Sequence, residues 1–172
     1  MRAAILPIAI WVSSVAGAQA TAQASDCSTA KPALPPELAG WSRPTLLTAG
    51  RSTEAATRIA LSLGEAAQLR LKPTPSVRYA VNPEKPGAPA SHGGLVSFTV
   101  TRPGTYRVAL GAAAWIDVIR EEKAATSVAH GHGPACSGIR KMVDFRLEPG
   151  RYLLQVAGAA DPVISVMVAA LR

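Results

Sequence analysis

Phe98-Thr-Val-Thr-Arg-Pro-Gly-Thr-Tyr106-Arg-Val-Ala-Leu110 and Phe145-Arg-Leu-Glu-Pro-Gly-Arg-Tyr152-Leu-Leu-Gln-Val156 are two similar phrases around which the chain is organised. Each phrase reads as a strand, a Pro-Gly turn, a tyrosine and a second strand, which predicts two equivalent β-hairpins. The tyrosine after each turn is expected to cover the edge of the core while its hydroxyl reaches the backbone.

Alternating apolar and polar residues continue this pattern on both sides of the phrases. The expected strands cover 66–72, 77–81, 94–100, 106–110, 114–120, 124–130, 139–147, 152–157 and 163–170. About nine short strands with almost no helix predict an all-β fold, an antiparallel β-sandwich or jelly roll. Residues 82–92 hold three prolines and are expected to form a surface loop.

The beginning of the chain divides into two parts before the sandwich. Residues 1–24 have a positive start, an apolar run and small-x-small cleavage sites, which predict a signal peptide cut after Ala20 or Ala24. Residues 25–62 are expected to form an extended arm and linker packing on the β-sandwich domain, 63–172. Within 52–63 the spacing fits a short helix or a strand, and we favour a short helix or irregular segment. No later stretch is long enough for a membrane span.

Two cysteines, Cys27 and Cys136, are the only ones in the chain. In an exported protein an isolated pair is most simply a disulfide, which would tie the mature N-terminus to a distant glycine-rich loop. The leader and the cysteine pair together predict a periplasmic protein.

The net charge is +7, and 18 basic residues stand against 11 acidic ones. A basic surface outside the cytosol suits an anionic ligand, a glycan or an acidic periplasmic protein. The positive residues are dispersed, and no nucleic-acid-binding motif is present, so nucleic acid is not an expected partner.

The segment His130-Gly-His132-Gly-Pro-Ala-Cys136-Ser-Gly-Ile-Arg140-Lys141 is the one stretch with possible chemistry. On a strand, His130 and His132 would project from one face, and with His92 they would suit iron, copper or zinc. A facial triad would instead combine the pair with Asp144 or Asp117. Alternatively, Arg140, Lys141 and Ser137, beside a turn with free amides, could hold a carboxylate or phosphate. A purely structural, solvated loop is the remaining interpretation.

Several short matches together resemble the bacterial pre-peptidase C-terminal domain. They are Leu63-Gly-Glu-Ala-Ala-Gln-Leu-Arg-Leu71, Pro103-Gly104-Thr-Tyr106 after Phe98, Trp115-Ile-Asp-Val118, and Pro149-Gly150-Arg-Tyr152 after Phe145. The resemblance implies a β-sandwich module of secreted enzymes without catalytic residues of its own. It departs from that family in having no accompanying peptidase domain.

The whole chain also resembles a group of small exported bacterial proteins that share the 130–141 segment and carry the name homogentisate 1,2-dioxygenase. That name implies a cupin-like enzyme with iron held by two histidines and a glutamate. No residue here matches that motif, so no role is carried over. The sequence therefore leaves two hypotheses: a non-catalytic periplasmic binding or accessory protein that uses the 130–141 loop, and a small metal-dependent dioxygenase that uses His130 and His132.

Overall fold

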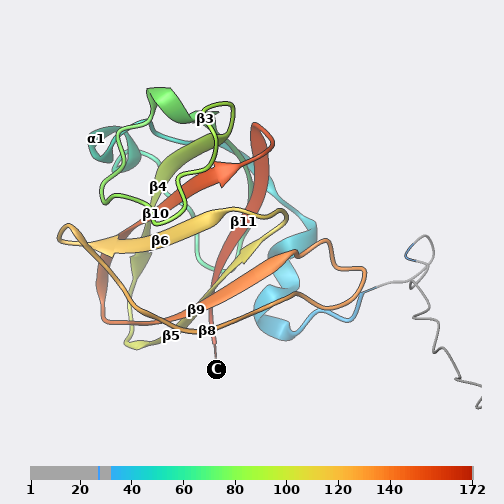
Figure 1. Cartoon of the computed structure of the whole chain (residues 1–172). Coiled ribbons are helices and arrows are strands. Elements are labelled where there is room, and N and C mark those ends of the chain that lie inside the picture. Colours follow the sequence, from blue (N-terminus) through green and yellow to red (C-terminus); the bar gives the residue numbers. More distant parts are fainter. Residues whose placement is uncertain (1–26, 28–31, 172) are drawn as a thin grey trace, which may run out of the picture.

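The computed structural model describes Cys27 and residues 32–171, and the predicted signal peptide lies outside this part. The described residues form two sheets packed face to face (Figure 1). The six-stranded sheet has the order β1 (Thr45–Thr48), β2 (Ala66–Arg70), β11 (Val163–Ala170), β5 (Gly104–Leu110), β9 (Lys141–Leu147), β8 (Ser127–Gly131). The five-stranded sheet has the order β3 (Lys72–Pro73), β4 (His92–Val100), β10 (Gly150–Ala159), β6 (Trp115–Arg120), β7 (Lys123–Ala124).

This architecture confirms the predicted all-β sandwich. The strand pairs are antiparallel except β1 and β2, which run parallel. The two inner faces meet in one apolar core, because alternate residues of each strand point inward. Its fully buried members include Leu69, Val96, Phe98, Val108 and Leu154.

The two Pro-Gly phrases do not form the predicted hairpins. Strand β4 lies in the five-stranded sheet, whereas β5, which follows the first turn, lies in the six-stranded sheet. The second phrase likewise leads from β9 in one sheet to β10 in the other. Tight hairpins favour turns with positive φ at their centre, and proline is fixed near −65°, so Pro-Gly suits a crossing between sheets better.

Instead of folding back on themselves, the two phrases pair with each other. Phe98 lies opposite Tyr152 in one sheet, and Tyr106 lies opposite Phe145 in the other. Each tyrosine hydroxyl donates to the carbonyl four residues earlier, at Arg102 (2.8 Å) and Glu148 (2.9 Å). The predicted role of the tyrosines is thereby confirmed, and the two crossings close one end of the core.

Residues 77–81 were expected to form a strand, and this prediction is wrong. The backbone N–H groups of Ala80 and Val81 donate to the side-chain Oε1 of Gln155, at 2.8 and 3.4 Å, and Gln155 Nε2 donates to the Val81 carbonyl at 3.0 Å. A buried side chain on β10 thus satisfies backbone groups that a neighbouring strand would otherwise satisfy. The alternation of apolar and polar residues at 77–81 does not reveal that a side chain distant in sequence supplies these hydrogen bonds.

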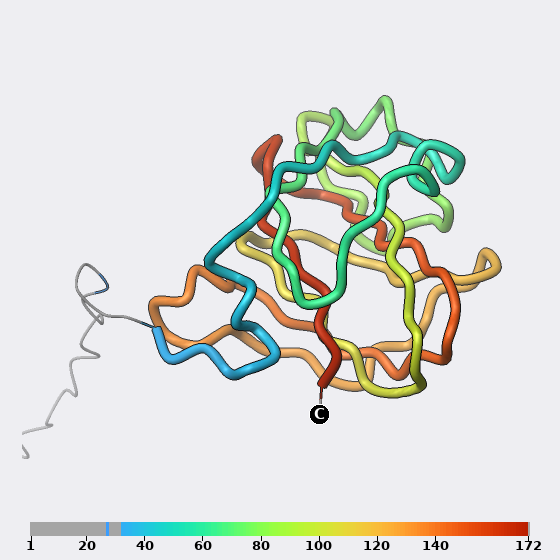
Figure 2. The backbone as a smooth tube through the Cα atoms, turned by 180° about the vertical axis from the view of Figure 1, so that it is seen from behind, coloured from blue at the N-terminus to red at the C-terminus, as the bar shows by residue number. Residues whose placement is uncertain are grey.

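The N-terminal described residues lie against the outer face of the six-stranded sheet. A 3-10 helix, η1 (Pro36–Ser42), buries Leu38 and Trp41 beside Met167. Figure 2 shows this segment next to the 132–140 loop, and Trp41 Nε1 donates to the Ser137 carbonyl at 2.9 Å. The stretch expected as an arm therefore also supplies an edge strand, β1.

Two short helices complete the described elements. The helix α1 (Thr53–Ala56) confirms the expectation of a short helix within 52–63, and Ser52 caps it by accepting from the Ala55 N–H at 3.4 Å. The remainder of that segment is irregular apart from a bridge between Ala60 and Ser97. A second 3-10 helix, η2 (Thr74–Ser76), follows β3.

Candidate functional site

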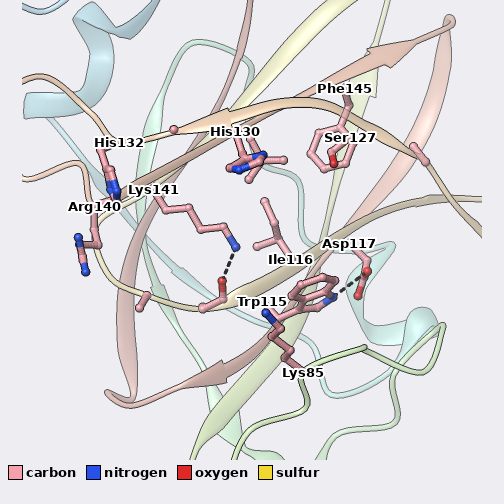
Figure 3. A pocket seen from close by; sticks show the side chains of 15 residues that line it. Lys85, Trp115, Ile116, Asp117, Ser127, His130, His132, Arg140, Lys141 and Phe145 are labelled. Atoms are coloured by element: carbon pink, nitrogen blue, oxygen red, sulfur yellow. Dashed lines mark hydrogen bonds between the residues drawn. The ribbon is translucent and has the colours of Figure 1, made fainter.

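A cleft of about 590 Å³ opens between β6 of one sheet and β8 and β9 of the other (Figure 3). The cleft lies at the edges of both sheets. Strand β8 is the last strand of the six-stranded sheet, and β7, the last strand of the five-stranded sheet, is only two residues long and leaves the space beside β6 open. The polar side chains that line it are Lys85, Asp117, Ser127, His130, His132, Arg140 and Lys141. The apolar lining comes from Trp115, Ile116, Val143, Phe145 and alanines.

Lys85 and Lys141 approach the same aromatic ring in this cleft. Their Nζ atoms lie 5.5 and 5.6 Å from the centre of the Trp115 ring, within the range of cation–π attraction. Lys141 Nζ also donates to the Ala114 carbonyl at 2.9 Å. In the part of the chain that the structure describes, neither ammonium has a carboxylate within ion-pair distance.

Lys141 is held in a poor environment for its charge. Burial lowers the pKa of the Lys141 ammonium, and the nearby Lys85 lowers it further, while Asp117 acts in the opposite direction. An ammonium has three N–H donors, and one of them is used on Ala114. Two donors therefore remain for a group that enters the cleft.

Asp117, the carboxylate of the cleft, is already engaged by neutral donors. Its Oδ1 accepts from Trp115 Nε1 at 3.0 Å, and its Oδ2 accepts from Gln155 Nε2 at 2.9 Å. Burial raises the pKa of Asp117, whereas these two hydrogen bonds act to lower it. Glu84 raises the pKa further and Lys141 lowers it.

Gln155 connects Asp117, on β6, with the backbone at residues 80–81. The side chain is fully buried, and besides Asp117 it binds the backbone of Ala80 and Val81. That backbone leads directly into the loop that carries Lys85. Gln155 therefore connects Asp117 to the backbone that precedes the Lys85 loop.

The predicted histidines do not gather in one place. His130 lies on β8 and His132 just after it, both exposed at the cleft, and His132 Nδ1 lies 2.9 Å from the Arg140 carbonyl. His92 was expected in the surface loop, but it is the first residue of β4 in the other sheet and does not line the cleft. Among Cys27 and residues 32–171, no three His, Cys, Asp or Glu side chains are arranged to hold a metal ion.

Asp144, one carboxylate considered for a metal triad, points to the opposite face of β9. It accepts from Arg107 Nε and Nη2, both at 2.8 Å, and it is nearly buried. This bidentate pair raises the pKa of Arg107 and satisfies the carboxylate. Asp144 is thus a structural residue of the sheet.

Ser137 is close to the cleft in sequence but does not line it. Its hydroxyl donates to the Pro134 carbonyl at 2.6 Å and accepts from the Ile139 N–H at 3.1 Å. The neighbouring Cys136 forms a disulfide with Cys27, as the sequence predicted. Ser137 and the disulfide therefore shape the loop, and Arg140 and Lys141 are the predicted ligand-binding residues that face the cleft.

Neither Lys85 nor Gln155 was singled out from the sequence, and Trp115 entered only as part of an expected strand and of the resemblance. Lys85 stands in a proline-rich loop that follows the backbone bound by Gln155, and no local pattern links residues so far apart in the chain. The available signal was the pair Trp115 and Asp117. Side chains two residues apart on a strand project from the same face, so these two could be expected to lie together.

Comparison with known proteins adds no family. The chain matches no known family model and shows no significant match to a curated protein. The described residues contain no helix long and apolar enough to cross a bilayer. The disulfide fits an exported protein, because such bonds persist in oxidising compartments.

Proposed function

We propose that this chain is a non-catalytic periplasmic binding protein that holds an anionic ligand in the cleft beside the 130–141 loop. The observation that supports this most strongly is the pair of ammonium groups, Lys85 and Lys141, on one tryptophan ring without an ion-paired carboxylate in the described structure. Arg140 adds a further positive charge at the same opening.

The Lys85 and Lys141 ammonium groups lie beside the same Trp115 ring and repel each other. Burial lowers the pKa of the Lys141 ammonium, and the nearby positive charge of Lys85 lowers it further. An anion placed beside both would accept the free N–H groups and remove the repulsion. The site is therefore better satisfied with an anion bound than without one.

The size of the cleft favours a small molecule. A volume of about 590 Å³ lies within the ordinary range for small-ligand pockets, which is roughly 300–1,000 Å³. An apolar lining with a few convergent charged groups is typical of such sites. The resemblance to non-catalytic modules of secreted enzymes agrees with a binding role.

The test is a set of anion titrations followed by NMR on the ¹⁵N-labelled processed chain. Acetate, inorganic phosphate, galacturonate and hexanoate are added in turn, and the amides of Gly131 and Lys141 and the Trp115 indole N–H are followed. We expect saturable shifts with at least one anion, and at least tenfold weaker binding in Lys141→Met. Lys123→Met, an exposed lysine outside the cleft, should bind as the natural chain does. The proposal is wrong if no anion shifts these signals or if Lys141→Met binds equally well.

Metal analysis of the same sample tests the dioxygenase hypothesis. One equivalent of iron, copper or zinc that disappears in the His130→Ala/His132→Ala double variant would replace the binding proposal with a metal enzyme. A metal content below a tenth of an equivalent in both proteins would leave that hypothesis without its cofactor.

A further inference from the structure

The cleft changes character along its length. On β9, Lys141, Val143 and Phe145 alternate with residues of the other face, and all three line the cleft. Two residues of a strand advance about 6.6 Å, so Lys141 and Phe145 are roughly 13 Å apart along the strand. The floor therefore runs from an ammonium to two buried apolar side chains.

The opposite wall follows the same gradient. Trp115 is the first residue of β6, and Ala114, whose carbonyl accepts from Lys141, precedes it. Ala125 lies farther along this wall, because its N–H donates to the Val118 carbonyl at 2.7 Å. On β8, Ser127 lies opposite Phe145. Figure 3 shows Ser127 and Phe145 together at one end, away from His132, Arg140 and Lys141.

We call the part around Lys85, Trp115 and Lys141 the charged end and the part around Ala125, Ser127 and Phe145 the apolar end. Among the described residues that line the cleft, Ala125, Ser127 and Phe145 are uncharged, whereas His130 lies opposite Val143 and Asp117 lies on β6 between Trp115 and the Val118 carbonyl that Ala125 contacts. Phe145 is 3% exposed and Val143 is 6% exposed, so both belong to the core and reach the cleft with only a small part of their surface. A ligand with one anionic group at the charged end and an uncharged remainder therefore matches the lining at the two ends.

We propose that the ligand is a single-chain anionic amphiphile, with a carboxylate head at Lys85 and Lys141 and an apolar tail over Val143 and Phe145. This inference rests on the proposed function and narrows its ligand to one chemical class. The occupant is a free molecule, because the apolar residues lie inside a cleft of limited volume and not on a broad exposed face. A membrane-embedded lipid of the same head charge is the competing source.

Chain length provides the first test. The processed chain is titrated with acetate, hexanoate and octanoate, each below its micelle concentration, and with 1-octanol as a neutral partner. Each buried methylene strengthens binding roughly two- to fourfold, so octanoate should bind at least about fiftyfold more tightly than acetate. Octanoate should shift the amides of Val143 and Phe145 as well as Lys141, and 1-octanol should bind at least tenfold more weakly than octanoate.

A variant at the apolar end provides the second test. Ser127 is exposed on an edge strand, so Ser127→Asp places a charge beside Phe145 without disturbing the core. We expect at least tenfold weaker octanoate binding and unchanged acetate binding, while Val128→Asp, at an exposed position of the same strand that does not line the cleft, should leave both unchanged.

The outcomes separate this inference from the proposed function. Binding of acetate and octanoate with equal affinity would overturn the amphiphile and leave the anion site intact. A complete lack of anion binding would overturn both. Shifts of the same amides with phosphatidylglycerol vesicles but not with octanoate would show that the head group of a membrane lipid, and not a free molecule, is recognised, and would also overturn the inference.

Discussion

Strand β9 carries charged residues on both of its faces. The charge on one face is paired with an opposite charge, and the charge on the other face is not. On the face covered by η1, Asp144 lies directly opposite Arg107 and makes two 2.8 Å hydrogen bonds to its guanidinium. Glu37 of η1 adds a third charge, 3.7 Å from Arg107. On the cleft face, Lys141 has one carbonyl partner and faces a second ammonium, Lys85.

The difference separates a group that stabilises the fold from a group that is available for binding. Asp144 has little left to offer a ligand, because both of its oxygens accept from Arg107. Lys141 keeps two free donors and is charged at a cost. Binding sites commonly hold such strained charges, and stability is lower there as a result.

The largest expected effect on stability comes from removal of the Asp144–Arg107 ion pair. Asp144→Ala removes both 2.8 Å hydrogen bonds from the partly buried Arg107 guanidinium and leaves it, among the described residues, only Glu37, 3.7 Å away, so we expect the free energy of unfolding to fall by about 3 kcal/mol. Urea unfolding measures this loss, while anion binding in the cleft should change by less than twofold. The double variant Arg107→Met/Asp144→Leu should lose much less than Asp144→Ala, because the guanidinium is removed together with its main partner. Equal losses in both variants would show that packing, and not charge pairing, matters at this position.

Removal of the Gln155 amide should have the next largest effect, and it acts on both properties. Gln155→Leu leaves the Ala80 N–H, the Val81 carbonyl and one Asp117 oxygen without this partner, which costs about 2 kcal/mol. The loop with Lys85 should loosen, and hexanoate binding should weaken at least fivefold. Gln68→Leu makes the same change on an exposed strand position and should alter neither. Unchanged binding in Gln155→Leu would mean that Lys85 is positioned by its own loop.

The strands show which features of the fold the sequence could predict. Alternation located most of the strands correctly, because a period of two follows from one buried face per strand. The same alternation at 77–81 was misleading, since Gln155, distant in sequence, supplies the hydrogen bonds there. Pairing was predicted less well: Phe98 and Tyr152 meet across the two phrases, and the local Pro-Gly signal favoured a hairpin.

The candidate site was predictable only where its residues are close in the chain. Arg140, Lys141 and the two histidines come from one segment and do face one cleft. Ser137 belongs to the same segment, but its hydroxyl is used within the loop. Lys85 joins the site through a tertiary contact, and the different surroundings of Lys141 and Asp144 depend on which face of β9 is covered.

Replacement of Lys141 should remove function without loss of stability. Lys141→Met keeps the length and apolar stem of the side chain and removes a charge whose burial is unfavourable. We expect at least tenfold weaker anion binding together with an unchanged or higher free energy of unfolding, measured in urea at pH 7. A less stable Lys141→Met protein would mean that the hydrogen bond to Ala114 outweighs the cost of burying the charge.

The smallest expected effect is a pH dependence of the difference in free energy of unfolding between Lys141→Met and the natural chain. Because burial lowers the pKa of Lys141 in the folded chain, the folded state disfavours the charged form relative to the unfolded state, where lysine titrates near 10.4. The favourable contribution of a neutral Lys141 is therefore present above the unfolded pKa and is lost as pH falls through the folded pKa. Lys141→Met should exceed the natural chain in stability most clearly at pH 7, and the gap should narrow as the pH rises toward 10.5. Urea unfolding of both proteins at each pH measures the gap, and other titrating groups cancel in the difference. A gap that widens with pH would show that the folded structure favours the charged form of Lys141, and the contrast with Asp144 would then disappear.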